Sequence, residues 1–262
     1  GMPYLKDAIL SIRKSSVFPK IVIIIDNGST DTSLDYLNSL NFEEFLIKVV
    51  RINTKGTGHA LNEGLKHIDT EYVMRMDSDD LILEEKIAKQ LDAFSKDDNL
   101  FIVGTNAFYF IQNTNNILHS TSTPIEHDEI LKSYSQGFHG MFDGTIMFKN
   151  DPIIKQCFYS EALQTGNEFS FHLDLIKNNN LKALNLSEKL YFIRLHDLST
   201  TDDSMLNDFK KIFLIRNRYF NRNILIYEKF CAYRLYVHHK LWRMVLFAKN
   251  KSKIKYYLML IC

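Results

Sequence analysis

Cysteine is scarce in this 262-residue chain, and it has no long apolar run. The three cysteines, Cys157, Cys231 and Cys262, are odd in number and widely spaced, with no Cys-x-x-Cys pair. This argues against a disulfide framework or a zinc site and indicates a reducing compartment. No apolar run approaches the roughly 18 residues that a membrane-spanning helix needs, and no signal-peptide pattern opens the chain. We therefore expect a cytoplasmic protein, either one α/β domain with an appended region or one large domain.

The net charge of +1 conceals a strong asymmetry. Residues 205–262 carry 13 basic and 2 acidic residues, a net of +11, whereas the rest of the chain carries 19 basic and 29 acidic residues, a net of −10. A basic tail behind an acidic body favours contact with something anionic, such as the inner face of a membrane. A solvated helical surface explains the same charges equally well. Aromatic residues lie among the Lys and Arg of residues 220–247, as in single-strand nucleic-acid binders, but nothing else supports a nucleic-acid partner.

Strand and helix patterns alternate along the first 111 residues. Strands are predicted at residues 21–25, 45–52, 71–76 and 100–111, and helices from about residue 32 and at 58–67 and 83–94. This alternation is typical of a doubly wound, mostly parallel α/β sheet. Later the pattern loosens to a helix at 126–134, a short strand at 145–149, a helix at 168–178 and strand-like segments up to 196.

Two acidic clusters follow predicted strands at the edge where such sheets bind ligands. Asp26 and Asp31 follow the first strand, and Asp77, Asp79 and Asp80 follow the third. Carboxylates grouped at a strand end repel one another, and oxygen ligands of this kind suit Mn²⁺ or Mg²⁺ completed by substrate phosphate. The alternative is a helix N-terminus that favours acidic residues in its first turn. The position at a strand end favours the metal site.

Six motifs, in order, resemble those of glycosyltransferase family 2 and together cover about residues 3–201. They are residues 21–31, Asn53-x-x-Gly56 with residues 60–64, residues 71–80, residues 145–149, residues 167–171 and Arg194-x-His196-x-x-Ser199. The resemblance implies a GT-A nucleotide-sugar-binding and catalytic domain over residues 3–204, followed by a basic helical region over 205–262. It implies an inverting transferase that moves a hexose or N-acetylhexosamine from a UDP-sugar to a glycan or glycolipid acceptor. The resemblance points to lipopolysaccharide, capsule or exopolysaccharide synthesis.

The resemblance also implies roles for the matching residues. Glu168 stands where the family has its catalytic base, usually Asp, with Glu161 as a rival. The metal, Mn²⁺ or Mg²⁺, is expected on Asp77, Asp79, Asp80 and His196. The nucleotide-sugar is expected on Asp26, Asn27, Ser29, Lys55, Gly56, Asn62, Asp77, Arg194, His196 and Ser199. Asn27 replaces the usual second Asp, and its amide can also hydrogen-bond uracil. His139, beside Gly137 and Gly140, marks a loop that could lie at the acceptor mouth.

One element of the resembled family has no counterpart. There, a central strand precedes the helix that begins here near Tyr4, but no apolar run occurs before residue 21. We expect the stretch that begins at Tyr4 to form that helix, with no strand in residues 3–20, and the sheet to lack its usual first strand. The gap would be filled by another segment or a second copy of the chain, or the sheet would rearrange around it. UDP binding and transfer should then be weak, and a version extended upstream should bind UDP more tightly.

Two other functions compete with the transferase. The Glu168 substitution and the missing strand favour a catalytically silent relative that binds nucleotide-sugar as a scaffold. A nucleotidyltransferase shares the sheet type, but it would need a Gly-rich phosphate loop after its first strand, and none is visible. Measuring donor hydrolysis with Mn²⁺ would distinguish the active transferase from the silent scaffold.

Overall fold

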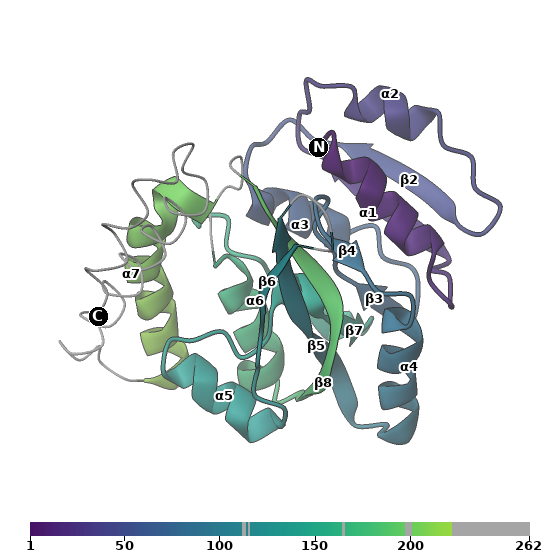
Figure 1. Ribbon diagram of the computed structural model, residues 1–262. Coiled ribbons are helices and arrows are strands. Elements are labelled where there is room, and N and C mark those ends of the chain that lie inside the picture. The colour runs from purple at the N-terminus through teal and green to yellow at the C-terminus, as the bar shows by residue number, and fades with distance from the viewer. Residues whose placement is uncertain (112–113, 115, 164–165, 197–200, 222–262) are drawn as a thin grey trace, which may run out of the picture. The chain divides into compact units, whose positions relative to one another are not determined.

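The computed structural model describes residues 1–111, 114, 116–163, 166–196 and 201–221, with no side-chain description for 201–210. The chain divides into two compact units. The first comprises Gly1–Ala162 and Asn167–His196, and the second comprises Leu163–Gly166 and Asp197–Cys262. The described strands all belong to the first unit (Figure 1). Among the described residues, no helix is long and apolar enough to cross a membrane.

A two-stranded parallel sheet begins the first unit. Its strands are β1 (Ile21–Asp26) and β2 (Leu46–Arg51), paired in register from Ile21 opposite Leu46 to Asp26 opposite Arg51. Two helices, α1 (Tyr4–Arg13) and α2 (Ser33–Asn38), supply the buried side chains that cover one face, while α3 (Thr57–Leu65) packs against β1. The five aliphatic residues of β1 are only partly buried, although such a run is typical of a strand covered on both faces.

The expected first strand is absent, as the sequence predicts. Residues 3–20 contain α1 and a turn but no strand. Among the described residues, β1 pairs only with β2, so its other edge has no strand partner. No described segment fills the gap, and the strands lie in two separate sheets rather than one.

The second sheet has six strands in the order β3-β7-β5-β8-β4, with β6 paired to β5. The strands are β3 (Tyr72–Met74), β4 (Leu81–Ile82), β5 (Leu100–Ile111), β6 (Ile117–Ser120), β7 (Met147–Lys149) and β8 (Lys182–Leu195). The long β5 and β8 are parallel, but β7 is antiparallel to both of its neighbours, β3 and β5. The expectation of a mostly parallel sheet is therefore wrong in detail. The order of strands along the chain does not reveal their order in the sheet. Here β3 and β5 are parallel to each other, and the later strand β7 lies between them and is antiparallel to both.

The main core lies around β5, where Ile102 and Val103 are fully buried. The remaining helices of the first unit are α4 (Lys86–Lys96), α5 (His127–Ser135) and α6 (Glu168–Leu173), the last extended by a π-helical turn at Asp174–Asn178. Helix α4 begins three residues later than predicted because the preceding residues pair with β8. Leu81 and Ile82 form β4, and the amide of Leu83 donates to the carbonyl of Leu190 at 3.0 Å.

The second unit contains α7 (Thr201–Phe220). The helical prediction for residues 205–262 is confirmed as far as residue 220, and residues 222–262 lie outside the described part of the chain. Within α7, Ile212 and Phe213 are buried, whereas Leu214 is 64% exposed. The basic side chains of this region were predicted to face outward, but Arg216 is fully buried.

Candidate functional site

Asp79, in the loop between β3 and β4, lies beside His196 at the end of β8. Asp79 follows β3 in the acidic loop, and His196 directly follows the last residue of β8. Oδ2 of Asp79 lies 2.9 Å from Nε2 of His196, and both side chains keep contact with solvent, with exposures of 33% and 12%. The ring of Tyr4 in α1 packs against the imidazole with ring centres 4.6 Å apart. A carboxylate oxygen and an imidazole nitrogen at this spacing fit two ligands of one divalent cation.

Asp80 is the buried member of the acidic cluster. Its Oδ1 accepts the backbone N–H of Arg194 at 2.7 Å, and the residue is only 4% exposed. Burial raises the pKa of Asp80 well above its usual range, and the charges of Asp77 and Asp79 raise it further. A carboxylate placed in this way anchors the acidic loop to β8.

Asp77 turns toward a cation of the protein itself. Its Oδ2 lies 2.5 Å from a guanidinium nitrogen of Arg75, whose Nε lies 2.6 Å from Asp143. The three carboxylates of the cluster therefore have three different partners. Across the described residues, no three His, Cys, Asp or Glu side chains converge as a metal site. The predicted metal site therefore stays a prediction. Of its four proposed ligands, Asp77, Asp79, Asp80 and His196, the side chains of Asp79 and His196 contact each other.

Arg194 joins the acidic loop to α1. Its Nε donates to the carbonyl of Asp79 at 2.7 Å, and a terminal nitrogen lies 3.1 Å from Asp7. The guanidinium lies 4.7 Å from the ring centres of both Tyr4 and Phe110. These contacts leave only 2% of its side chain exposed. Arg194 thus holds the acidic loop against α1, and its predicted contact with phosphate remains untested.

The first acidic cluster is organised by its own turn. Asp26 ends β1 and accepts the amide of Ser29 at 3.0 Å, while its other oxygen lies 3.3 Å from Nε of Arg51. The side-chain amide of Asn27 donates to the backbone carbonyl of Gly56 at 3.1 Å. Gly56 has a φ of 120°, which favours glycine because it has no Cβ. Four of the predicted nucleotide-binding residues are thereby brought together.

Of the other residues predicted to bind the nucleotide-sugar, Lys55 is described by the structure and Ser199 is not. Lys55 directly precedes Gly56 and is exposed beside this turn. Ser199 lies outside the described residues, so its position is not defined. Arg194 and His196 belong to the second cluster rather than the first.

The segment from Met2 to Tyr4, which leads into α1, contacts both clusters. The backbone N–H of Met2 donates to Oδ2 of Asp31 at 3.0 Å, and Tyr4 packs on His196. A chain spans at most about 3.6 Å per residue, so the backbone positions of Met2 and Tyr4 lie within roughly 7 Å of each other. The two acidic clusters therefore lie near each other, although they follow strands of different sheets. A shared cleft for a nucleoside diphosphate at the two clusters stays a prediction.

Glu168 begins α6, as predicted. Its side chain is 14% exposed, and Oε1 lies 3.3 Å from Nδ1 of His139. The preceding residue, Asn167, fixes the start of the helix through a 2.7 Å hydrogen bond from its amide to Thr57 of α3. That Glu168 projects into the same cleft as Asp79 remains a prediction.

A buried polar network connects α6 with the acidic loop. Nε2 of His172 lies 3.0 Å from Asp143, and Nδ1 lies 2.7 Å from the hydroxyl of Tyr134. Asp143 also binds Arg75 and through it Asp77. Sequence reasoning missed this network. The available signal was an arginine in the otherwise apolar strand at 71–76, since a charge in a buried strand requires a partner.

Asn62 and Glu161 contact each other. The amide of Asn62 donates to the carbonyl of Tyr159 at 3.0 Å and to Glu161 at 2.9 Å, and its oxygen accepts the amide of Tyr159 at 2.8 Å. Glu161 also lies 3.2 Å from Nδ1 of His59. Asn62 therefore attaches α3 to the loop before α6, and its predicted contact with nucleotide-sugar remains untested.

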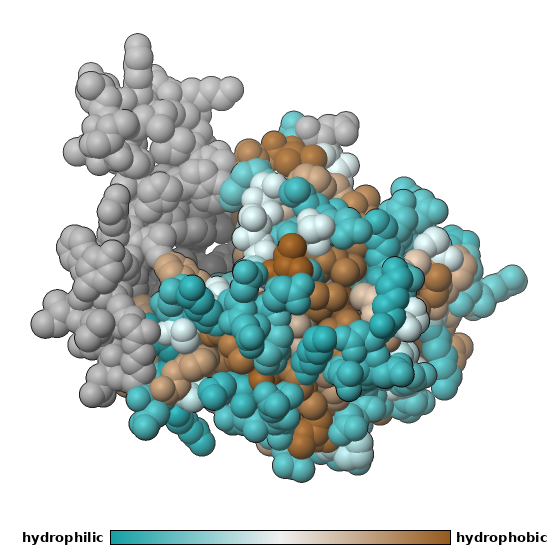
Figure 2. Space-filling view, turned by 90° about the horizontal axis from the view of Figure 1, so that it is seen from below, coloured by the Kyte–Doolittle hydropathy of each residue, from teal (hydrophilic) through white to brown (hydrophobic). Residues whose placement is uncertain are grey.

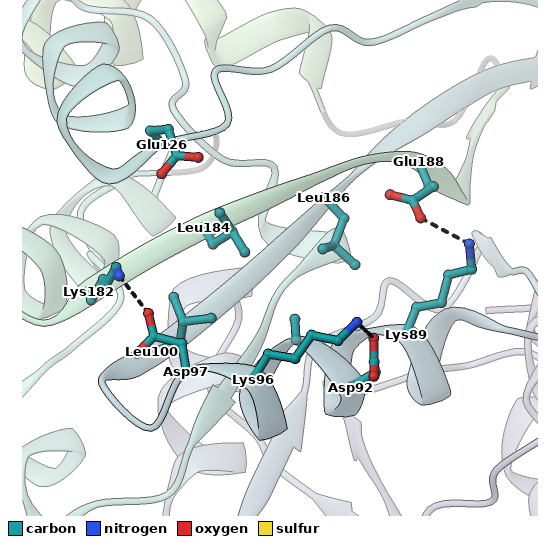
Figure 3. A pocket seen from close by; sticks show the side chains of 11 residues that line it. Lys89, Asp92, Lys96, Asp97, Leu100, Glu126, Lys182, Leu184, Leu186 and Glu188 are labelled. Carbon is teal, nitrogen blue, oxygen red and sulfur yellow. Dashed lines mark hydrogen bonds and ion pairs between the residues drawn. The ribbon is translucent and has the colours of Figure 1, made fainter.

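A pocket of about 480 Å³ lies between α4 and β8, and none of the predicted site residues lines it. Figure 3 shows its apolar floor of Leu100, Leu184 and Leu186 and its charged rim. The rim charges pair with one another in Lys89–Glu188, Lys96–Asp92 and Lys182–Asp97 at 2.5–2.9 Å. The face in Figure 2 is mainly hydrophilic, with apolar residues in a central band. We find no converging charges in this pocket that would bind an anionic donor.

Comparisons with known proteins identify related sequences. Residues 2–156 match the family model for glycosyl transferase family 2. An uncharacterized glycosyltransferase of Haemophilus influenzae is 27% identical over 85% of this chain and 84% of its own length. A poly-beta-1,6-N-acetyl-D-glucosamine synthase of Staphylococcus epidermidis is 30% identical over 48% of this chain, and the match spans only 30% of that protein.

Solved structures share the fold at lower identity. S. aureus TarS residues 1–349 in complex with UDP-GlcNAc aligns with a TM-score of 0.66 at 18% identity, covering 96% of this chain and 72% of that one. The mannosyltransferase PcManGT of Pyrobaculum calidifontis, in complex with GDP-Man and Mn²⁺, aligns with a TM-score of 0.59 at 13% identity, covering 99% and 70%. The first unit thus has the GT-A arrangement of a mixed α/β sheet flanked by helices.

Proposed function

From the premise that the chain belongs to glycosyl transferase family 2, we propose that it is an inverting, metal-dependent hexosyl- or N-acetylhexosaminyltransferase. The donor is a UDP-sugar and the acceptor is a glycan or glycolipid of lipopolysaccharide, capsule or exopolysaccharide synthesis. The names of the TarS complex and the poly-N-acetylglucosamine synthase support this choice. The observation that carries the proposal is the Asp79–His196 pair packed against Tyr4, two residues after the Met2 amide that contacts Asp31 of the first cluster.

The donor is proposed to bind across the two clusters. Asn27 and its neighbours Asp26, Ser29, Lys55 and Gly56 face the nucleoside. Asp79 and His196 hold Mn²⁺ or Mg²⁺, with Asp77 beside them and Asp80 anchoring the loop from beneath. When bound, the cation offsets the negative charge of the diphosphate that departs. Arg194, Ser199 and Asn62 are proposed as further contacts to the nucleotide-sugar.

Glu168 is proposed as the general base. One carboxylate oxygen takes the proton from the acceptor hydroxyl as that oxygen attacks the anomeric carbon. A new carbon–oxygen bond forms on one face of the sugar, and the bond to the diphosphate breaks on the opposite face. The bonding electron pair leaves with the diphosphate, so the anomeric configuration inverts.

Residues 205–262 are proposed to bring the enzyme to an anionic membrane surface at the inner face of the cell membrane. Each basic residue close to such a surface adds on the order of 1 kcal/mol of binding free energy. Sedimentation with anionic vesicles at low salt should therefore exceed sedimentation with neutral vesicles. Equal sedimentation would contradict the membrane contact while leaving the transferase untouched.

The decisive test is donor turnover. Purified chain with Mn²⁺ should be stabilised against heating by one of a panel of UDP-sugars, and it should release UDP from that sugar. Asp79→Ala should lose the stabilisation that depends on Mn²⁺, whereas the exposed Asp98→Ala control should keep it. Stabilisation that is equal with and without the metal would contradict the proposed donor site.

A silent, nucleotide-sugar-binding scaffold is the second candidate. The separate partners of Asp77, Asp79 and Asp80 favour it, because a working metal site needs more ligands than the assembled pair. This candidate predicts UDP-sugar binding without release of UDP over long incubation. Turnover that Glu168→Gln abolishes would exclude it.

A further inference from the structure

His139 lies beside Glu168 and has no part in the chemistry proposed above. It belongs to the loop between α5 and the short 3₁₀ turn Asp143–Thr145. The 3.3 Å separation of its Nδ1 from Oε1 of Glu168 is the ion-pair contact that joins this loop to α6. A side chain in that position can fix the orientation of the carboxylate.

The backbone around His139 is held by hydrogen bonds on both sides. The amide of Phe138 donates to the carbonyl of Ser133 at 3.0 Å, and the Ser133 hydroxyl donates to the carbonyl of His139 at 3.2 Å. The carbonyl of Gly140 accepts the buried side-chain amide of Asn185 at 2.8 Å. The loop is therefore anchored to α5 and to β8.

Two glycines let this loop close against α5. Gly137 has a φ of 88°, a conformation that side chains with a Cβ rarely adopt. A Cβ on Gly140 would lie 2.7 Å from the carbonyl oxygen of Ile130 in α5, so any larger residue would push the loop outward. Gly137 and Gly140 thus allow the loop conformation that places His139 close to α5.

Aromatic contacts fix the imidazole itself. Its ring stacks on Phe142 with centres 5.9 Å apart and meets the edge of Phe169 at 5.1 Å. Phe169 directly follows Glu168, so the ring and the carboxylate move with the same helix turn. These contacts direct Nδ1 to Glu168.

Three titratable groups face His139. Glu168 and His172 lie on α6, and Asp143 begins the 3₁₀ turn. The imidazole is 40% exposed. Its partial burial lowers the pKa of His139 and His172 lowers it further, while Glu168 and Asp143 act in the opposite direction. Nδ1 can carry a hydrogen in the protonated imidazole and in one neutral tautomer, so either form can donate to the carboxylate.

We propose that His139 is a positioning residue for Glu168, holding Oε1 through an Nδ1–H donor so that Oε2 faces the acceptor hydroxyl. This role rests on the proposed function of Glu168 as base. A small misplacement of a reacting group costs on the order of 100-fold in rate. His139 acts only through the carboxylate and does not touch the reacting atoms.

Three substitutions separate this role from a structural one. In His139→Asn, the side-chain amide nitrogen takes the place of Nδ1, whereas His139→Gln puts its amide near the place of Nε2. His139→Ala removes the donor. With UDP-GlcNAc, Mn²⁺ and N-acetylglucosamine oligosaccharides as the probe, we expect kcat to fall on the order of 10- to 100-fold in the Ala and Gln variants. The Asn variant should recover most of it, and KM for UDP-GlcNAc should stay within about twofold in all three, because ground-state donor binding is untouched.

A titration by NMR tests the contact without any substrate. The Cε1–H signal of His139, assigned by its loss in His139→Asn, reports the imidazole pKa in the whole chain. Glu168→Gln should lower that pKa, because it removes an adjacent negative charge. An unchanged pKa would overturn the proposal. Full activity of His139→Ala together with an inactive Glu168→Gln would also overturn the positioning role, while the proposal that Glu168 is the base would stand. Undiminished transfer by Glu168→Gln would refute both the base and the positioning role.

Discussion

The two sheets of the first unit differ in packing, and each carries one half of the proposed donor site. In the six-stranded sheet, Ile102 and Val103 of β5 are fully buried, and Asp80 is fastened to β8. In the two-stranded sheet, the aliphatic residues of β1 are all partly exposed and one edge of β1 has no strand partner among the described residues. The proposed metal ligands therefore lie beside a well-packed sheet, and the proposed nucleoside contacts lie beside a less completely buried one. Binding energy and stability should divide in the same way.

The largest expected effect concerns the carboxylate next to the large sheet. Glu168→Gln should lower transfer by about 10²- to 10⁴-fold, the usual contribution of a general base. The matched control is Glu161→Gln, which removes the rival carboxylate paired with His59 and Asn62. Steady-state kinetics with a UDP-sugar and Mn²⁺ measures both. The reverse ranking of the two variants would transfer the role of base to Glu161.

The second effect compares the packing of the sheets directly. Ile102→Ala in β5 should lower the free energy of unfolding by about 2–5 kcal/mol, because it leaves a cavity in a packed core. Ile25→Ala in β1 removes the same atoms from a partly exposed site and should cost about 1 kcal/mol. Urea unfolding monitored by circular dichroism gives both values. Equal losses would show that the β1–β2 sheet is packed as tightly as the large one.

The third effect uses a lysine buried beneath the large sheet. Lys86 is fully buried, donates to Gln90 at 2.8 Å, and has its pKa lowered by burial to about 7. Between that value and the ordinary pKa near 10.5, the unfolded chain holds a proton that the folded chain has released. The contribution of Lys86 to the free energy of unfolding should therefore rise with pH, by about 2 kcal/mol from pH 7 to pH 9.

Lys86→Met should remove that part of the pH dependence, and the exposed Lys6→Met should keep it. Urea unfolding of the three proteins at pH 7 and pH 9 provides the comparison. If the wild type and Lys86→Met show the same change between the two pH values, the folded chain keeps the lysine protonated throughout.

The smallest effect belongs to the nucleoside half. Asn27→Ala removes one uncharged hydrogen-bonding group and should weaken UDP binding by about 1 kcal/mol, or roughly fivefold. The loss should be the same with and without Mn²⁺, because Asn27 lies on the other sheet from the proposed metal ligands. Calorimetry measures both conditions. A loss that appears only with Mn²⁺ would couple the two halves and weaken the comparison.

Periodicity and motif order predicted most of the elements and the family. The apolar run at β1 and the long run at β5 identified strands, and the absence of a strand-like apolar run before residue 21 predicted the interrupted sheet. Strand direction was beyond these signals, because β7 lies between two strands that precede it in the chain. The site was predicted by residue type and place, as with Asp79 and His196, but not by partner. Arg75 and Asp143 separate Asp77 from its neighbours, and His139 reaches Glu168 only through a loop closed by two glycines.

The most direct test of the shared donor site is a crystal structure of the chain with UDP and Mn²⁺, in which anomalous scattering locates the manganese. The account predicts manganese bonded to a carboxylate oxygen of Asp79 and to Nε2 of His196. It also predicts the uracil ring beside Asn27, so that one nucleotide spans both sheets. Manganese away from Asp79 and His196, or a nucleotide that touches only one of the two acidic clusters, would contradict it.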